Sequence, residues 1–211
     1  MIEVKNQFAR HLMLWVLTLP FLAVFLMPAM MEADRLQVPR TERQMLIDLG
    51  QDPAAVTARA NAIFMRLFVE TGAVEVSGKL FRAKDRGRIG QQNQLTTAKA
   101  SNRYVDGFWN LLYRAIWRFM GLWPVLAVLL MAFAIPALMD GMVIRKSKVH
   151  RFQSHNPVFF WASSHAVITT SGAFMFLPFL PFAISLPVLY GAVALVSTGL
   201  WTTAANFQTG T

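Results

Sequence analysis

The chain has 211 residues, of which 55% are hydrophobic and 15% are charged, and its mean hydropathy is +0.42. Its net charge of +9 is spread between apolar segments, so no region is basic enough to predict a dedicated nucleic-acid-binding domain. Cysteine is absent, which excludes disulfides, thiol chemistry and cysteine-ligated metals.

Apolar residues form long runs that predict membrane-spanning helices. Residues 12–31 are 20 consecutive uncharged residues, residues 119–139 are 21, and residues 152–211 contain no Asp, Glu, Lys or Arg. About 20 apolar helical residues suffice to cross a bilayer core. We therefore predict an all-α integral membrane protein with about four transmembrane helices and one helical soluble insert between the first and second.

The first predicted segment, residues 1–31, is an N-terminal signal-anchor helix. It begins with a short basic stretch, as a signal peptide does. Ala29 is followed by Met30 and Met31, which is a poor signature for cleavage, so we expect the helix to stay attached.

Residues 32–103 are predicted to form an exported, partly helical insert. A short helix is predicted with Thr41 as its N-cap and Gly50 after its end. A longer helix is predicted over residues 52–72, with Asp52 as N-cap and a glycine as its stop. Residues 73–102 are polar and show no periodicity, which favours a loop.

Residues 104–139 are predicted to form a juxtamembrane helix that continues into the second span. Three aromatic residues of the interfacial type lie at its start, and Arg114 and Arg118 are expected to extend toward lipid phosphates. The aromatic residues are Trp109, Tyr113 and Trp117.

A basic loop over residues 140–157 and a transmembrane hairpin over residues 158–211 complete the predicted plan. Asn156 and Pro157 favour a helix start near residue 158, and a proline-rich turn divides the hairpin into helices over residues 158–178 and 186–206. Because the short loop carries four basic residues and one acid, it should be cytoplasmic. Both termini are then cytoplasmic and the insert lies outside, in the periplasm of a double-membrane bacterium.

His165 is the main candidate for a polar function inside the bilayer. It shares a predicted helix face with Thr169, and the last helix carries Thr198 and Thr202 at a spacing of four. Small and hydroxyl residues allow close helix packing in lipid, so we expect His165 to face the fourth span. The alternative is an ionisable group on a transport path.

Bond chemistry is not predicted, and we expect no catalytic, cofactor-binding or metal-binding residues. Ser164 and His165 are adjacent on a helix and point about 100° apart, so they cannot face each other as a nucleophile and its base. His150 has no neighbouring ligand set of a recognised metal motif. The basic run at residues 79–88 is interpreted as a solvated loop, with anionic lipid or an acidic partner as the next alternative.

The sequence LMDGMVIRKSKVHRFQSHNPVFF, which ends the second span, and the hairpin LPFLPFAISLPVLYG form a combined pattern. It resembles the integrating conjugative element membrane protein family, over about residues 104–206. These are small inner-membrane proteins linked to conjugation and type IV secretion. The resemblance implies candidate functional or packing residues at Asp140, Gly141, Arg145, Arg151 and Ser154.

The resemblance implies a non-enzymatic inner-membrane accessory or scaffolding component of a bacterial conjugative DNA-transfer system, encoded on a mobile genetic element. Its expected partners are the lipid bilayer, membrane proteins of the conjugation apparatus and further copies of itself; direct nucleic-acid binding is not favoured. Two alternatives stay open. One is a small transporter or channel-like protein that uses His165 and the threonine-lined C-terminal hairpin, and the other is a membrane-tethered nucleic-acid binder.

Overall fold

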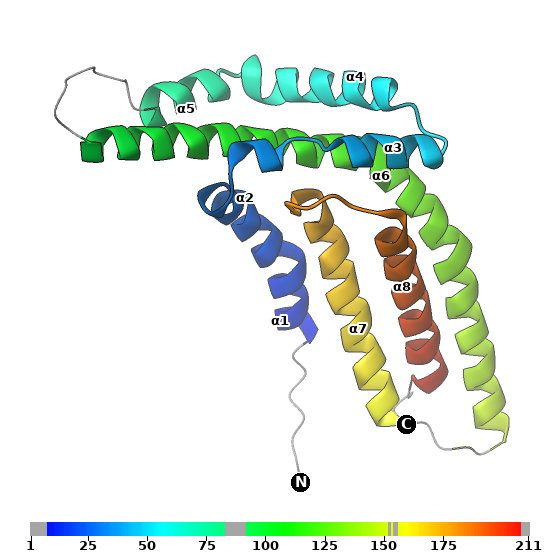
Figure 1. The fold of residues 1–211 in the computed structure, drawn as a ribbon. Helices are drawn as coiled ribbons and strands as arrows, with labels where there is room; N and C mark the ends of the chain where they lie inside the picture. The colour runs from blue at the N-terminus through cyan, green and yellow to red at the C-terminus, as the bar shows by residue number, and fades with distance from the viewer. Residues whose placement is uncertain (1–7, 83–91, 152, 154–155, 208–211) are drawn as a thin grey trace, which may run out of the picture. The chain divides into compact units, whose positions relative to one another are not determined.

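The computed structural model describes residues 8–82, 92–151, 153 and 156–207. Within these residues every regular element is a helix (Figure 1). The elements in chain order are α1 (Phe8–Leu12), η1 (Met13–Thr18), α2 (Leu19–Met30), η2 (Ala33–Leu36), α3 (Arg40–Asp48), α4 (Pro53–Phe64), η3 (Met65–Val69), α5 (Ala73–Phe81), α6 (Gln92–His150), α7 (Pro157–Phe176), η4 (Leu177–Phe179) and α8 (Leu186–Asn206).

Three helical segments among the described residues are long and apolar enough to cross a membrane: Ala9–Met30, Ala98–His150 and Leu186–Asn206. The chain is therefore a helical protein with the properties of a membrane protein. The predicted third span, α7, is 20 residues long but is not one of the three. Its serine, threonine and histidine residues between positions 163 and 171 lower its hydropathy.

The chain forms two compact units, and α6 contributes to both. Unit 1 contains residues 1–20, 123–177 and 184–211. Unit 2 contains residues 21–122 and 178–183. The proline-rich turn after α7 therefore belongs to unit 2, although the helices on both sides of it belong to unit 1.

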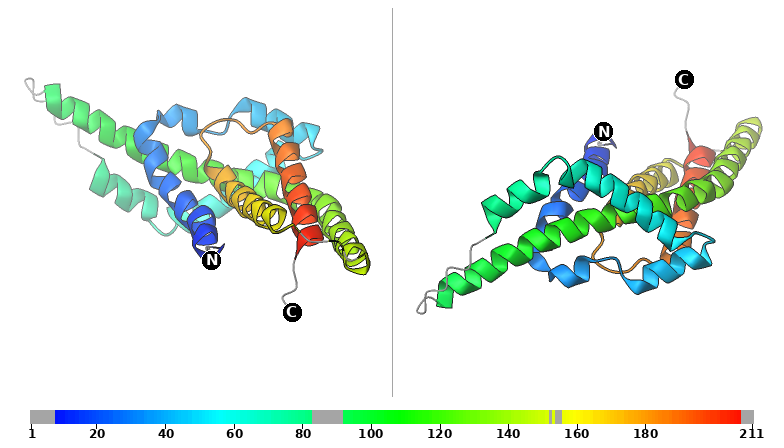
Figure 2. Two further views of the ribbon diagram at one scale, coloured as in Figure 1. Left: turned by 90° about the horizontal axis from the view of Figure 1, so that it is seen from below. Right: turned by 90° about the horizontal axis from the view of Figure 1, so that it is seen from above.

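In unit 1, α7 lies between α8 and the N-terminal helical segment, as two views of the ribbon agree (Figures 1 and 2). Glycines allow these helices to approach closely. A Cβ atom added at Gly172 of α7 would lie 2.5 Å from the Cβ atom of Trp15, and one added at Gly199 of α8 would lie 2.8 Å from Val167. Small residues at helix contacts are the usual means of close packing between helices in lipid.

In unit 2, short helices cover the first part of α6. Asp52 caps α4 by accepting a hydrogen bond from the backbone N–H of Ala54 at 2.9 Å. Leu46 and Val56, both fully buried, pack over Gly121 of α6, where an added Cβ atom would lie 2.9 Å from a Leu46 methyl carbon. Gly121 thus allows α3 and α4 to lie close to α6.

Four helix predictions need correction. The short helix predicted to have Thr41 as its N-cap begins at Arg40, with Pro39 in the cap position, so Thr41 lies inside α3. The helix expected over residues 52–72 is α-helical only to Phe64, continues as a π-helical turn to Val69, and stops at Gly72, whose φ of 75° suits glycine. Residues 73–102, expected to be largely loop, contain α5 and about the first three turns of α6. Residues 140–150, predicted as loop because they are basic, continue α6.

The boundaries predicted for the last two helices are close to those observed. The side chain of Asn156 caps α7 by accepting from the backbone N–H of Val158 at 2.9 Å, with Pro157 at the first helical position. The predicted range of residues 186–206 coincides with α8.

Candidate functional site

The most prominent polar feature of unit 2 is a buried cluster of Glu42, Arg114 and Arg118. The three side chains are 0–1% exposed. Glu42 lies in the first turn of α3, and the two arginines are one turn apart on α6. Arg114 Nη2 donates to Glu42 Oε1 at 2.8 Å and Arg118 Nε donates to Glu42 Oε2 at 3.0 Å, while Arg118 Nη2 also donates to Oε1. One carboxylate thus joins two guanidinium groups.

Other donors of this cluster bind backbone carbonyls, mostly those of the turn at residues 178–182, and Arg114 also donates to the carbonyl oxygen of Arg35 at 3.0 Å. Arg114 donates to the carbonyl oxygens of Pro181 at 2.9 Å and Phe182 at 3.0 Å. Arg118 donates to those of Pro178 at 3.0 Å, Leu180 at 2.6 Å and Phe182 at 2.7 Å. The cluster therefore fixes a turn that lies more than 60 residues farther along the chain.

The ionised state of Glu42 is favoured in the native fold. Burial raises the pKa of this carboxyl group, but the hydrogen bonds and charge of Arg118 and the charge of Arg114 outweigh burial and hold the pKa below its ordinary value. Buried charges are stable only when they are paired and their remaining hydrogen-bonding groups are satisfied. Here the carbonyl oxygens of the turn and of Arg35 accept from the terminal guanidinium nitrogens, whereas Arg114 Nε is buried without a hydrogen-bond partner.

The positions of Arg114 and Arg118 correct the prediction that they extend toward lipid phosphates. Both side chains are buried inside unit 2. The sequence contains a weak signal for this arrangement, because the spacing of four places both arginines on one face of α6. Glu42 is 72 and 76 residues away from them, and nothing local identifies it as their partner.

The three aromatic residues predicted to lie at a membrane interface instead attach α6 to α4 and α5. Trp117 Nε1 donates to Thr57 Oγ1 at 3.0 Å, Tyr113 Oη donates to Asn61 Oδ1 at 2.7 Å, and Trp109 Nε1 donates to Ser77 Oγ at 3.0 Å. The aromatic side chains recur every four residues, which aligns them along one face of α6. Burial of their rings together with these hydrogen bonds holds the two helices against α6.

In unit 1, Asp140 and Gly141 lie where α6 meets α8. Asp140 Oδ2 accepts a hydrogen bond from Trp201 Nε1 at 2.6 Å. A Cβ atom added at Gly141 would lie 2.5 Å from the carbonyl oxygen of Trp201 and 2.9 Å from the Cβ atom of Ala204. Both residues of this Asp–Gly pair therefore serve helix packing, one through its carboxylate and the other through its missing side chain.

The other residues implied by the resemblance have different environments. The guanidinium group of Arg145 lies over the ring of Phe207, 5.0 Å from its centre. Arg151 is exposed in the turn that ends α6. Ser154 lies outside the described residues, so its predicted role stays a prediction.

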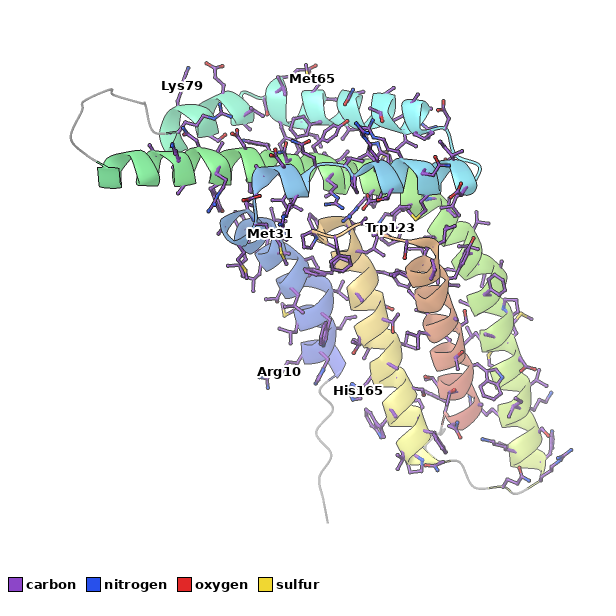
Figure 3. The ribbon with its side chains drawn as sticks, viewed as in Figure 1. Arg10, Met31, Met65, Lys79, Trp123 and His165 are labelled. Atoms are coloured by element: carbon purple, nitrogen blue, oxygen red, sulfur yellow. The ribbon has the colours of Figure 1, made fainter. Side chains whose placement is uncertain are left out.

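His165 faces the N-terminal helix rather than the fourth predicted span. Its ring centre lies 5.0 Å from that of His11, in an edge-to-face arrangement, and 6.2 Å from that of Trp161. Figure 3 shows His165 on the side of α7 that is turned toward α1. Gly172, on the same face of α7, contacts Trp15. The predicted small-residue face therefore exists, but it packs against a different helix.

The contact between α7 and α8 uses neighbouring positions instead. Thr203 Oγ1 donates to Ser163 Oγ at 2.9 Å, and Gly199 meets Val167. Thr169 and Thr198, which we predicted at this contact, are exposed, and the hydroxyl group of Thr202 donates to the carbonyl of Thr198 at 2.8 Å. The predicted threonine row is thus displaced by one residue from the observed interface.

The described residues contain no group of three His, Asp or Glu side chains that could hold a metal ion. The hydroxyl group of Ser164 donates to the carbonyl of Phe160 at 2.7 Å, within its own helix. Hydroxyl groups of helical serines commonly bond in this way, so the Ser164–His165 pair has an ordinary structural explanation.

Comparison with known proteins supports one family. A family model described as IncC plasmid conjugative DNA transfer protein DtrJ-like matches residues 25–208. No curated protein and no solved structure matches the chain. The association with conjugation predicted from the C-terminal motifs is confirmed, whereas the narrower integrating-element family stays a prediction. Because the match covers most of the chain, including parts of both units, this protein belongs to the DtrJ-like family of conjugative DNA transfer proteins.

Proposed function

We propose that this protein is a non-enzymatic, multi-pass component of the bacterial inner membrane that scaffolds a conjugative DNA-transfer apparatus of the type IV secretion kind. It acts by helix packing and by docking of its soluble insert on membrane-protein partners. The observation that carries this proposal is the family match over residues 25–208 in a chain with three candidate spans. The buried charged cluster adds support, because its donors hold backbone rather than pointing into an open site.

The proposed topology has four spans, with α7 as the third. Although α7 is less apolar than the other three, its hydroxyl groups at Ser163, Ser164 and Thr170 donate to carbonyls of their own helix. These internal hydrogen bonds lower the cost of placing the hydroxyl groups in lipid. The basic end of α6 favours a cytoplasmic position, which places both termini inside and the insert in the periplasm.

The insert offers a surface for a protein partner. Large apolar side chains of η3 and α5 are exposed, with exposed fractions of 49% for Met65, 52% for Leu67, 53% for Val76 and 71% for Leu80. Exposed apolar residues of neighbouring elements are typical of interaction surfaces. We propose a membrane protein of the conjugation apparatus as the occupant; self-association is the competing outcome.

The first experiment is an in-frame deletion of the gene in a donor strain, followed by measurement of conjugation frequency. We expect transfer to fall strongly and to be restored by the wild-type chain supplied in trans. Unchanged transfer would overturn the proposed function. Reporter fusions at Thr71 and after residue 207 test the topology separately, with a periplasmic signal expected at Thr71 and a cytoplasmic signal at the C-terminal end.

The transporter alternative has one specific observation in its favour, the contact between the His11 and His165 rings. Paired ionisable side chains inside a membrane protein can mark a proton path. His165→Leu distinguishes the two functions. A scaffold should retain transfer when the variant accumulates to normal levels, whereas a proton path should be abolished. His150→Leu, at the exposed end of α6, is the matched control.

A further inference from the structure

The last turns of α6 carry basic side chains that point in two directions. Lys148 and Arg145 point inward and contact the end of α8 and the residue that follows it. Lys148 Nζ donates to the carbonyl of Ala205 at 3.3 Å and to Asn206 Oδ1 at 3.0 Å, and Arg145 lies over the ring of Phe207. A cation at this position also interacts favourably with the negative C-terminal end of the α8 dipole. These two residues therefore stabilise the contact between the helix ends.

The outward face carries a different set of side chains. Lys146, His150 and Arg151 are exposed. Apolar side chains lie beside them on the same helix, with exposed fractions of 49% for Met142, 65% for Val143 and 55% for Val149. In the described part of the chain around this helix end, Asp140 is the nearest acid along α6, and its carboxylate accepts from Trp201.

Along α6, Lys146 lies just beyond the depth of the lipid headgroups, within the reach of its long side chain. The uncharged run of α6 ends at Met139, and Lys146 follows seven residues later, about 10 Å farther along the helix axis. Polar headgroup layers extend a bilayer of about 30 Å to about 40–45 Å in total. A long lysine or arginine side chain at this height can reach a phosphate.

We infer that Lys146 and Arg151, with the exposed apolar residues beside them on the same helix end, form a binding surface for anionic phospholipid headgroups. The exposed Met142, Val143 and Val149 favour a lipid over a nucleic acid, because nucleic-acid interfaces are strongly polar and charged. Met142 and Val143, which precede Lys146 on the helix, contact the upper acyl chains while the cations bind the phosphates. This inference requires only that α6 spans a membrane. It can therefore fail while the proposed conjugative function holds, and the conjugative function can fail while the lipid-binding surface holds.

The test uses a single cysteine, because the natural chain has none. The full-length Val143→Cys variant carries a fluorophore and is reconstituted into phosphatidylcholine vesicles. Equal small fractions of brominated phosphatidylglycerol or brominated phosphatidylcholine then quench the label. Each cation near the surface should enrich the anionic lipid locally by up to about fivefold. We expect stronger quenching by the anionic lipid, and a quenching ratio near one after Lys146→Gln and Arg151→Gln are combined.

Two controls make the result specific. Lys148→Gln removes a cation from the same helix end but from its inward face, and should keep the lipid preference. A label at Leu195, in the middle of α8, should show no preference. Quenching by brominated phosphatidylcholine verifies insertion of each variant.

Equal quenching by both lipids in the unsubstituted background, or a preference that survives the double substitution, would overturn the inference. Loss of single-stranded DNA binding in the double variant, with lipid preference intact, would also overturn it in favour of a nucleic-acid surface.

Discussion

The two units of this protein differ in the contacts that stabilise each of them internally. Unit 2 uses long side chains: two buried arginines reach a glutamate on α3 and the backbone of the turn at residues 178–182. Unit 1 relies on small residues at helix contacts, since a Cβ atom added at Gly141, Gly172 or Gly199 would collide with a neighbouring helix; in unit 2, Gly121 provides one such contact. Lost charge should therefore destabilise unit 2 above all, whereas added volume should destabilise the helix contacts of unit 1 and the contact at Gly121.

The largest expected effect is that of Glu42→Ala. Removing one partner of a buried ion cluster leaves the other charges uncompensated, which typically costs about 3–5 kcal/mol. We expect the variant to accumulate poorly in the membrane and to unfold at a lower temperature in detergent. Glu75→Ala is the matched control, because Glu75 pairs with Lys79 on the surface and such pairs contribute about 0–1 kcal/mol. Equal accumulation and equal unfolding temperatures of the two variants would contradict the expected difference between buried and surface ion pairs.

Acid should perturb the same cluster reversibly. The native pKa of Glu42 lies below its ordinary value, so between the two values the unfolded state binds more protons than the folded state. The stabilisation from Glu42 is therefore complete above about pH 5 and is lost as pH falls through the ordinary glutamate pKa of about 4.3 and below. Thermal unfolding of the wild type and Glu42→Gln across this range checks the sign. The stability difference between them should shrink as pH falls, and a difference that grows would be contrary to expectation.

A smaller effect is expected from Gly141→Ala. The added Cβ atom would meet the backbone of Trp201 at 2.5 Å, and overpacking of this kind costs about 1–3 kcal/mol. Gly191→Ala provides the control, since nothing lies within 4 Å of its added Cβ atom and alanine favours helix by up to about 1 kcal/mol. Thermal unfolding in detergent should show opposite signs for the two variants. A stabilised Gly141→Ala would argue against close backbone contact.

The smallest effect is expected from Thr198→Val, because Thr198 is exposed on α8. Surface substitutions of this kind usually change stability by less than about 0.5 kcal/mol. Thr203→Val removes the hydrogen bond to Ser163 and should cost about 1 kcal/mol more, measured by the same thermal unfolding. A larger loss of stability in Thr198→Val than in Thr203→Val would instead favour the contact between α7 and α8 through Thr198 that we predicted from the sequence.

Helix boundaries set by local chemistry were predictable. Asn156 and Pro157 signal the start of α7, and Asp52 signals the start of α4, because capping depends on residues within a few positions. The sequence does not predict the continuation of α6 through residues 140–150. A basic composition resembled a loop, although the lysine side chain at position 148 binds the end of α8.

The side-chain partners were not predictable, since they depend on how distant segments meet. Arg114 and Arg118 share a face by their spacing, yet only the fold brings Glu42 and the turn at residues 178–182 to them. His165 has a recognisable small-residue face, but the sequence does not say whether that face meets α8 or the N-terminal helix. Local pattern thus identifies interface residues without naming their partners.

The central structural claim is that the buried cluster fixes the turn onto unit 2. Spin labels at Lys99→Cys and Ala183→Cys, both in unit 2, test it directly by pulsed electron paramagnetic resonance. Lys99 lies 15 residues before Arg114 on α6, about 22 Å along the axis, which suits this measurement. We expect one narrow distance distribution with Glu42 present and a broad one in Glu42→Gln. An unchanged narrow distribution in Glu42→Gln would contradict the account.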